Sequence, residues 1–390
     1  MMDLLGAAVQ ALQQIFTFQS MAHMLIGVSL GTIIGIIPGL GGNFCLAILI
    51  PFIFSMNPVA GIAFLEGAHA ATATGSAVTS ILINTPGASF SAATCLDGYP
   101  MTKKGEAGRA LSAAAVASGV GGIIGAACLL LALPAVRPLV MAFSPPEFFA
   151  LTLFGIAMIA FVGEGSFGKS LISGLLGLLI SFIGNDPSTG INRFSFGTTY
   201  LFDGIDLIPV VIGLFAFSEM LTLIKERRGI VQAEIVARAT AAGILQGILD
   251  NLRHWWLLLR CSVLGTFLGF IPGIGGEVAG FIAYGHAVQS SKNPEEFGQG
   301  RVEGVIAPES ANNSKEGGAL IPTLAFGIPG SSGMAILLGA FLILGLEPGP
   351  SMLKENLPMT LVIVWTLAFA NLFAALICLG LANPLARIAR

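Results

Sequence analysis

Long runs of apolar residues, interrupted by Gly and Pro, limit what this sequence can fold into more than any other feature. Only 10% of the 390 residues are charged and the mean hydropathy is +0.87, whereas about 25% of residues in a soluble domain are charged. Helices and closed barrels are the structures that satisfy their backbone polar groups in hydrocarbon. Barrel strands alternate apolar and polar residues, and the sequence has no such alternation. It therefore predicts an all-α polytopic membrane protein.

Charge and cysteine content argue against other classes of protein. The net charge is −3, and no stripe of Lys and Arg with interleaved aromatic residues is present to bind nucleic acid. The five cysteines have no C-x-x-C spacing and indicate neither a disulfide framework nor a metal site; they are Cys45, Cys95, Cys128, Cys261 and Cys378.

Seven apolar runs approach the roughly 20 residues that a membrane-spanning helix needs. They cover residues 21–37, 107–133, 147–162, 169–184, 205–224, 256–271 and 357–382. Two further stretches, 38–96 and 272–347, are apolar but too often interrupted by Gly and Pro for simple spans. Polar residues such as Asp3 and Gln10 predict that the N-terminal stretch is an amphipathic helix along the membrane interface.

The distribution of basic residues sets the expected orientation. Six of the 18 Lys and Arg residues lie between 225 and 260, and the positive-inside rule places such a segment in the cytoplasm. Counting spans from this segment places Lys103 and Lys104 inside as well. The same count places the N-terminus and the acidic loop 185–204 outside.

An internal repeat is evident in the sequence. Residues 31–42 and 265–276 share eight of twelve residues around the motif Pro-Gly-x-Gly-Gly. The match continues downstream, where Glu66 corresponds to Glu309 at an offset of 243 residues. The helix before the first motif is expected to start outside and the helix before the second to start in the cytoplasm. The two copies are therefore predicted to be inverted, with broken helices or re-entrant hairpins at the middle of the membrane.

The repeat predicts how the chain is divided. Residues 1–224 form the first repeat, in which the Pro-Gly-broken segments 31–96 precede the spans that continue to 224. A basic cytoplasmic linker follows over 225–260, and residues 261–390 form the second, inverted repeat. Because position 390 corresponds to position 140, the second repeat is expected to be incomplete at its C-terminal end.

Matched breaks in inverted repeats are typical of secondary transporters, whose sites lie at the tips of discontinuous helices. Freed N–H groups at a helix start attract anions, and freed carbonyl groups bind cations. Alternatively, the breaks only kink helices for close packing. The four breaks supply the candidate substrate-binding residues: Pro38, Gly39, Gly41, Gly42 and Asn43; Asn84, Thr85, Pro86, Gly87 and Ser89; Pro272, Gly273, Gly275 and Gly276; Pro329, Gly330, Ser331 and Ser332.

Two polar stretches within the broken segments carry ionisable residues. The first begins at Glu66 and includes His69, and the second runs from Glu309 to Glu316. Ionisable residues at membrane depth usually face a cavity or pair with one another, which favours a cation or substrate pathway. Alternatively, the region 291–318 simply emerges into water. Glu66 and His69 could share a metal ion, but no second cluster of ligands accompanies them.

These motifs resemble those of a known family. The two copies of G-T-x-x-G-x-x-P-G-x-G-G, together with Glu66-Gly-Ala-His-Ala, Asn84-Thr-Pro-Gly-Ala, Asp97-Gly-Tyr-Pro and Pro308-Glu-Ser-Ala-Asn-Asn-Ser, resemble the large membrane subunit of tripartite tricarboxylate transporters, the TctA family. The resemblance covers nearly the whole chain. It implies a permease of the bacterial inner membrane that works with a small four-span subunit (TctB-like) and a periplasmic solute-binding protein (TctC-like). It also implies uptake of a carboxylate driven by an ion gradient of Na⁺ or H⁺, with no other cofactor.

We therefore expect a secondary transporter, a symporter of small carboxylates, whose four breaks enclose one site in the middle of the membrane. The residues expected to contact carboxylate oxygens are Asn43, Ser89, Ser331 and Ser332. The coupling cation is expected to bind Glu66, Asn312 and the carbonyl groups near Gly39 and Gly273.

Two other functions remain as alternatives. One is an intramembrane hydrolase that uses Glu66 and His69. The other is an assembly subunit that anchors a partner and has no pathway of its own. The identity of the carboxylate, the choice between Na⁺ and H⁺, and the oligomeric state are left open.

Family members usually continue through further C-terminal spans, which agrees with the expected incomplete second repeat.

Overall fold

The computed structural model describes residues 4–144, 146–147, 149–150, 153–154, 167–186, 191–202, 204–205, 209–210, 212–226, 239–272 and 276–388. The N-terminal part contains α1 (Leu4–Ile15), α2 (Phe18–Ile36), α3 (Gly42–Leu49), η1 (Ile50–Ser55), α4 (Pro58–Ile83), η2 (Ser89–Ser91), α5 (Ala92–Lys103) and α6 (Ala107–Met141). The middle part contains α8 (Phe167–Ser181), β1 (Gly184–Asn185), β2 (Asn192–Arg193), η3 (Thr199–Leu201), the π-helix η4 (Ile212–Phe217) and α10 (Ser218–Glu226). The C-terminal part contains α11 (Ala241–Arg253), α12 (Trp255–Phe270), α13 (Gly276–Ser290), η5 (Pro294–Glu296), α14 (Glu303–Phe326), α15 (Ser332–Ile343), α16 (Pro350–Lys354) and α17 (Leu357–Ile388).

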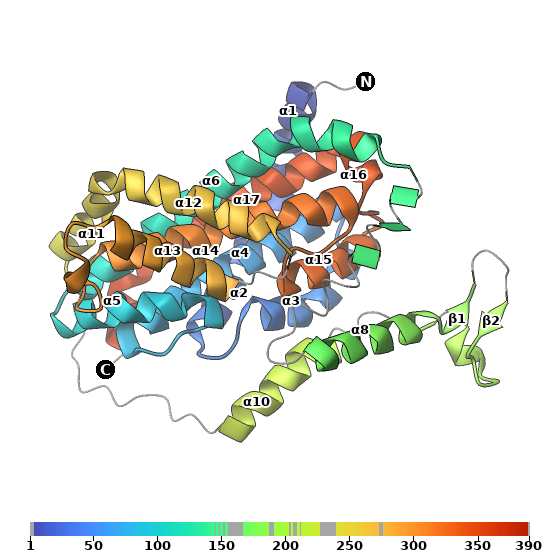
Figure 1. Cartoon of the computed structure of the whole chain (residues 1–390), viewed down its shortest axis with the longest axis horizontal. Coiled ribbons are helices and arrows are strands. Elements are labelled where there is room, and N and C mark those ends of the chain that lie inside the picture. Colours follow the sequence, from blue (N-terminus) through green and yellow to red (C-terminus); the bar gives the residue numbers. More distant parts are fainter. Residues whose placement is uncertain are drawn as a thin grey trace.

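The described residues are largely helical, and their one sheet is the antiparallel hairpin β1–β2 (Figure 1). Within these residues, three helices are long and apolar enough to cross a membrane: α2, α6 and residues 357–384 of α17. They coincide with three of the predicted spans. In the predicted spans 169–184 and 256–271 the helices α8 and α12 have only 15 and 16 residues. The predicted span 147–162 lies largely outside the described residues, and 205–224 contains η4 and α10 instead of one α-helix.

The largest difference from the sequence prediction concerns α4 and α14. The sequence predicted interrupted segments here, yet α4 is a continuous helix of 26 residues and α14 one of 24 residues. All residues of α4 from Ala60 to Leu82, and all residues of α14 from Gly304 to Ala325, are buried. Because other helices surround these two on all sides, their polar side chains avoid lipid. Hydropathy along the sequence does not reveal helices of this kind.

Local sequence sets the ends of both buried helices. The side chain of Asn57 accepts a hydrogen bond from the N–H of Ala60 at 2.9 Å, and Pro58 follows it at the first helical position. The helix α4 ends at Asn84 with φ 54°, and α14 ends at Gly327 with φ 67°. Both residues adopt the left-handed backbone conformation that commonly ends α-helices. Each of the four predicted breaks lies between the end of one helix and the start of the next.

The same glycine contacts recur in both copies of the sequence repeat. A Cβ atom at Gly31 of α2 would collide with the carbonyl oxygen of Ala68 in α4, and one at Gly265 of α12 would collide with that of Ala311 in α14. Two more matched pairs behave in the same way: Gly35 with Gly269, and Gly75 with Gly318. Small residues allow the backbones of membrane helices to approach closely. Each copy thus contains one closely packed pair, α2–α4 or α12–α14.

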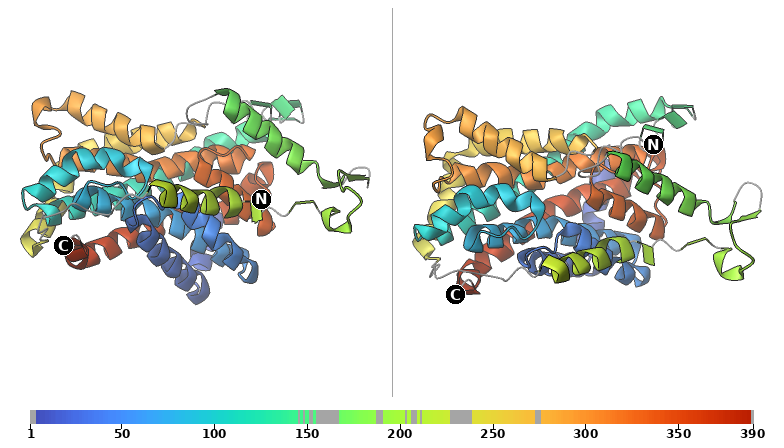
Figure 2. Two further views of the ribbon diagram at one scale, coloured as in Figure 1. Left: turned by 90° about the horizontal axis from the view of Figure 1, so that it is seen from below. Right: turned by 60° about the horizontal axis from the view of Figure 1, so that its bottom comes forward.

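The two copies interlock through α6 and α17. By sequence α6 belongs to the first copy, but it packs along α14 of the second, where its Gly125 would place a Cβ atom 2.5 Å from the carbonyl oxygen of Ser314. Conversely, α17 of the second copy packs along α2 and α4 of the first. In both views of Figure 2 the blue N-terminal helices and the yellow-to-orange helices α12 and α13 lie on opposite sides of the bundle. The repeats therefore form one interlocked bundle.

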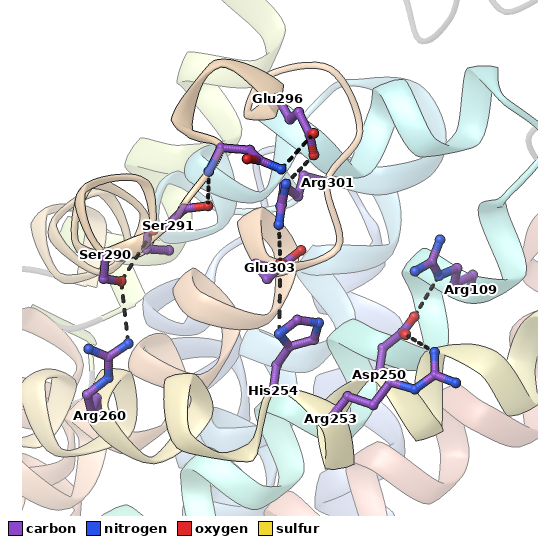
Figure 3. A network of polar contacts seen from close by, with 12 residues as sticks. Arg109, Asp250, Arg253, His254, Arg260, Ser290, Ser291, Glu296, Arg301 and Glu303 are labelled. Carbon is purple, nitrogen blue, oxygen red and sulfur yellow. Dashed lines mark hydrogen bonds and ion pairs between the residues drawn. The ribbon is translucent and has the colours of Figure 1, made fainter.

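A network of charged side chains joins the helices at the end of the bundle that contains α11 (Figures 1 and 3). Arg109 at the start of α6 donates to Asp250 of α11 at 2.6 Å. Arg301 lies 2.9 Å from Glu303 at the start of α14, and His254 lies 3.8 Å from the same carboxylate. The network fixes α11 and the start of α12 against α6 and α14. The helix α1 lies toward the opposite end in Figure 1.

The segments outside this bundle are more exposed. None of the described residues of α8 is buried, and α8 and the β1–β2 hairpin extend away from the bundle (Figure 1). The predicted linker 225–260 includes α11 and the start of α12, and its residues 227–238 lie outside the described residues. At the other end of the chain, α1 packs on α17, where Trp365 donates to the carbonyl oxygen of Ala8 at 3.2 Å.

Replacement of Gly318 by Ala should destabilise the bundle, because the new Cβ atom would collide with the carbonyl oxygen of Thr266 and force α12 and α14 apart. We expect the free energy of unfolding to fall by about 1–3 kcal/mol. Gly285→Ala in α13 is the matched control, since nothing lies within 4 Å of a Cβ atom there. Thermal unfolding in detergent measures both variants. Equal melting temperatures would contradict the close packing of α12 on α14.

Candidate functional site

The start of α3 in the first copy, at Gly42 and Asn43, meets the start of α15 in the second copy, at Ser332 and Gly333. We call these two helix starts the tips. Asn43, in the first turn of α3, donates from Nδ2 to the hydroxyl oxygen of Ser332 at 2.9 Å. Ser332 is the first residue of α15, and the hydroxyl of the preceding Ser331 caps this helix by accepting from the N–H of Met334 at 3.3 Å. The structure thus brings together two predicted substrate-binding residues that are 289 positions apart in the chain.

The imidazole of His69 lies between these two tips. A Cβ atom at Gly42 would lie 2.7 Å from Nδ1 of His69, and one at Gly333 would lie 2.5 Å from its Cε1. His69 is 7% exposed, and within the described residues neither ring nitrogen has a hydrogen bond. Both tips therefore need glycine at the position that faces His69, which α4 supplies from the interior of the bundle.

A buried ion pair adjoins His69. Nζ of Lys315 lies 2.5 Å from Oε1 of Glu316, and Oε2 of Glu316 lies 3.4 Å from Nε2 of His69. Lys315 and Glu316 are 6% and 5% exposed. The alternative that the region 291–318 emerges into water is therefore wrong for residues 304–318, which are buried, whereas most residues from 292 to 299 are exposed. Together with Glu66, these three residues form what we call the charge cluster.

Glu66 lies one turn before His69 on α4. It is 2% exposed, and neither carboxylate oxygen has a hydrogen-bond partner among the described residues. The side chain lines a small cavity, otherwise apolar, between α4, α15 and α17, whose other lining residues are Ile62, Leu65, Leu337, Ala340, Phe341, Leu344 and Ile363. It is close enough to His69, Lys315 and Glu316 to interact with them electrostatically. A buried carboxyl group without a partner is costly unless a proton or another cation neutralises it.

The equivalent positions of the second copy differ in one respect. Glu309, which corresponds to Glu66, is fully buried and accepts hydrogen bonds from the hydroxyl groups of Thr94 at 2.5 Å and Ser118 at 2.8 Å. Asn312, which corresponds to His69, is also buried, and its amide has no partner among the described residues. The predicted cation residues Glu66 and Asn312 are thus both buried with polar atoms unpaired.

A backbone hydrogen bond joins the two breaks of the first copy. Gly39 donates its backbone N–H to the carbonyl oxygen of Gly87 at 3.0 Å, and Gly87 donates to that of Ser76 at 3.3 Å. In the second copy Gly330 donates its N–H to the hydroxyl of Thr323 at 3.2 Å. The backbone N–H groups of these three glycines are therefore occupied in this structure.

The remaining predicted residues lie at helix ends. The hydroxyl of Thr85 donates locally to the carbonyl oxygen of Ile83 at 3.3 Å. Gly41 precedes α3, Asn84 and Pro86 follow α4, Ser89 begins η2, Pro38 and Pro272 follow α2 and α12, Gly276 begins α13, and Pro329 lies between α14 and α15. Gly273 and Gly275 lie outside the described residues.

Sequence reasoning missed the central place of Lys315 and Glu316. One signal for it was present: Thr72, one turn after His69, corresponds to Lys315 at the repeat offset of 243. Because Thr72 is expected to lie near His69, the repeat predicts that Lys315 lies at the equivalent place in the second copy, close to the same tips. Within the part of the chain that the structure describes, no three His, Cys, Asp or Glu side chains are grouped to hold a metal ion.

Comparison with known proteins gives a consistent result. The family model described as "Tripartite tricarboxylate transporter TctA family" matches residues 21–390. The "Uncharacterized 52.8 kDa protein in TAR-I ttuC' 3'region" of Agrobacterium vitis is 34% identical over 381 residues, which are 98% of this chain and 75% of that protein. The "Uncharacterized protein in TAR-II ttuC' 3'region" of the same organism is 39% identical over 117 residues, 30% of this chain and 48% of that protein. No solved structure matches the chain.

Thr94→Val should destabilise the protein by about 1–3 kcal/mol, because it removes one of two donors to the buried carboxyl group of Glu309. Thr366→Val is the matched control, since the hydroxyl of Thr366 is buried without a partner among the described residues. The control should be neutral or stabilising. Thermal unfolding in detergent compares the two. A loss of stability as large in the control would show that the hydroxyl of Thr94 has no special role.

Proposed function

Because the chain belongs to the tripartite tricarboxylate transporter TctA family, we propose that it is the permease subunit of an uptake system for small carboxylates in the bacterial inner membrane. Two observations indicate a membrane protein: the chain belongs to a transporter family, and three of its described helices are long and apolar enough to cross a membrane. The observation that carries the proposal is the meeting of the two tips, joined by Asn43 and Ser332, around the buried imidazole of His69. A polar, charged junction of broken helices inside a membrane bundle is what a secondary transporter requires.

In this proposal the two copies of the repeat cross the membrane in opposite senses. The recurrence of the glycine contacts in α2–α4 and α12–α14 supports equivalent folding of both copies. Arg109, Arg253 and Arg301 are gathered in the charged network at one end of the bundle, which the positive-inside rule assigns to the cytoplasm. Opposite orientation places both pairs of breaks at the same depth, where they enclose one site.

The substrate would bind between the tips. Asn43 and Ser332 would exchange their mutual hydrogen bond for bonds to carboxylate oxygens, with Ser331 in the same break as Ser332 and Ser89 in the break that follows α4. The coupling cation, Na⁺ or H⁺, would bind Glu66 and Asn312, whose polar atoms are unpaired, together with carbonyl groups near Gly39 and Gly273. Movement of one tip against the other would expose the site to each side in turn.

The tripartite family implies two partners for this subunit. We propose that a small four-span membrane subunit and a periplasmic solute-binding protein complete the system, the second of them delivering the carboxylate. The hydrolase alternative gains no support from the site. Among the described residues neither ring nitrogen of His69 reaches a hydroxyl group that could act as a nucleophile, and the hydroxyl of Thr72 donates instead to the carbonyl oxygen of His69 at 2.6 Å.

Gly42→Ala and Gly333→Ala should each lower uptake of radiolabelled citrate by about tenfold or more, because displacing the ordered imidazole of His69 costs about 1–3 kcal/mol. Gly285→Ala in α13, outside the breaks, is the matched control, since nothing lies within 4 Å of a Cβ atom there. The assay uses proteoliposomes that contain both membrane subunits, with the binding protein outside and an inward cation gradient.

The outcomes separate the three functions. Normal uptake in both Gly42→Ala and Gly333→Ala would contradict a site between the tips and favour an assembly subunit. Chemical conversion of citrate without its appearance inside the vesicles would favour the hydrolase.

A further inference from the structure

Glu316 is held in the way that a bound carboxylate would be held. One carboxylate oxygen is 2.5 Å from the ammonium group of Lys315, and the other is 3.4 Å from Nε2 of His69. The contact with Lys315 is a hydrogen bond from a charged donor, one of the strongest kinds in proteins, whereas Nε2 of His69 lies at ion-pair distance without a hydrogen bond. Lys315 and His69 together therefore make a carboxylate-binding pair, and a side chain of the protein itself occupies it.

This pair lies at the junction of the breaks. The imidazole of His69 contacts the positions of Gly42 and Gly333, one from each copy. Nζ of Lys315 lies 5.7 Å from the centre of the ring of Phe90, in the segment that follows the Pro86-Gly87 break. A carboxylate that entered between the tips would arrive beside the two groups that now hold Glu316.

The ion pair of Lys315 with Glu316 does little to hold helices together, because both residues lie on α14. Adjacent residues on a helix do not face each other, so the two side chains must turn toward a common point to meet. An ion pair within one helix also joins no second element to it. Glu309, seven residues earlier on α14, is satisfied instead by hydroxyl groups of α5 and α6.

The charges of the cluster balance only when a proton or another cation neutralises Glu66 or when His69 is protonated. Lys315 carries the one permanent positive charge, whereas Glu66 of α4 and Glu316 of α14 are both carboxyl groups and His69 of α4 is neutral unless protonated. These four are the charged and titratable groups that interact in this part of the described structure. A second carboxylate at Lys315 would therefore add an uncompensated negative charge to a buried site, which is strongly unfavourable.

We infer that Glu316 is an internal substitute for the substrate, which holds Lys315 while the site is empty and is displaced when a carboxylate of the substrate binds. This inference rests on the proposed function and specifies how its site works. Displacement leaves Glu316 without its ammonium partner, so a cation must enter to neutralise it. Competition between two carboxylates for Lys315 thus links entry of the substrate to entry of the cation.

Binding of radiolabelled citrate to the purified complex of the two membrane subunits tests this inference. Glu316→Gln removes the competing charge, so citrate should bind more tightly; if Glu316 holds Lys315 for about nine-tenths of the time, the gain is about tenfold. The dependence of the Kd on the cation that affects the wild type, Na⁺ or H⁺, should also become shallower. Lys315→Met should lose binding. Glu309→Gln, a change of the same kind on the same helix, is the control and should keep the wild-type Kd.

The direction of the change in Kd decides the result. Weaker or unchanged binding in Glu316→Gln would overturn the inference, because an ion pair that only stabilises the fold predicts one of those results. If thermal unfolding shows that Glu316→Gln does not fold, Glu316→Asp replaces it; its shorter side chain withdraws from Lys315, and binding that is not tighter than in the wild type overturns the inference. A wild type that binds no carboxylate would refute the proposed function itself, whereas wild-type binding without a gain refutes the inference alone.

Discussion

A charged group that leaves water for an apolar interior must find a partner there, and the structure depends on how this constraint is met. Glu66, His69, Lys315 and Glu316 lie on two helices that other helices surround completely. Such helices can pack closely because glycines line their contacts with α2, α12 and α6. At Glu66 and Asn312 such partners are missing among the described residues, which is why the proposed function assigns the coupling cation to these two residues.

Duplication and interlocking explain why these groups meet in one place. The helix α6 of the first copy packs on the second, and α17 of the second packs on the first. The starts of α3 and α15, one from each copy, are held at one junction. The hydrogen bond between Asn43 and Ser332 and the position of His69 between Gly42 and Gly333 are consequences of this arrangement. A site formed by two tips can change when one tip moves against the other, which is the physical requirement for alternating access.

The sequence predicts some of these features because they depend on residues that are close together in the chain. The helices α2, α6 and α17 follow from continuous apolar runs, and the ends of α4 and α14 follow from Pro-Gly motifs after Asn84 and before Ser331. The continuity of α4 and α14 could not be predicted in this way, because residues such as His69 lower the hydropathy of helices that never face lipid. The contacts of Lys315 and Glu316 depend on how the two copies pack, which no pattern along one stretch of sequence contains. Sequence reasoning therefore found the breaks, Glu66 and His69, but not the ion pair of Lys315 with Glu316 beside them.

The orientation of the two copies is the claim on which the proposed mechanism depends most, and labelling of single cysteines measures it directly. In a variant without the five native cysteines, Gln19→Cys introduces an exposed thiol at the start of α2 and Lys292→Cys introduces one after α13. A maleimide that does not cross membranes is added to intact spheroplasts. Opposite orientation predicts that the thiol of Gln19→Cys reacts at once and that of Lys292→Cys reacts only after the membrane is made permeable. Reaction of both thiols from the same side would contradict inverted repeats and the single site between their tips.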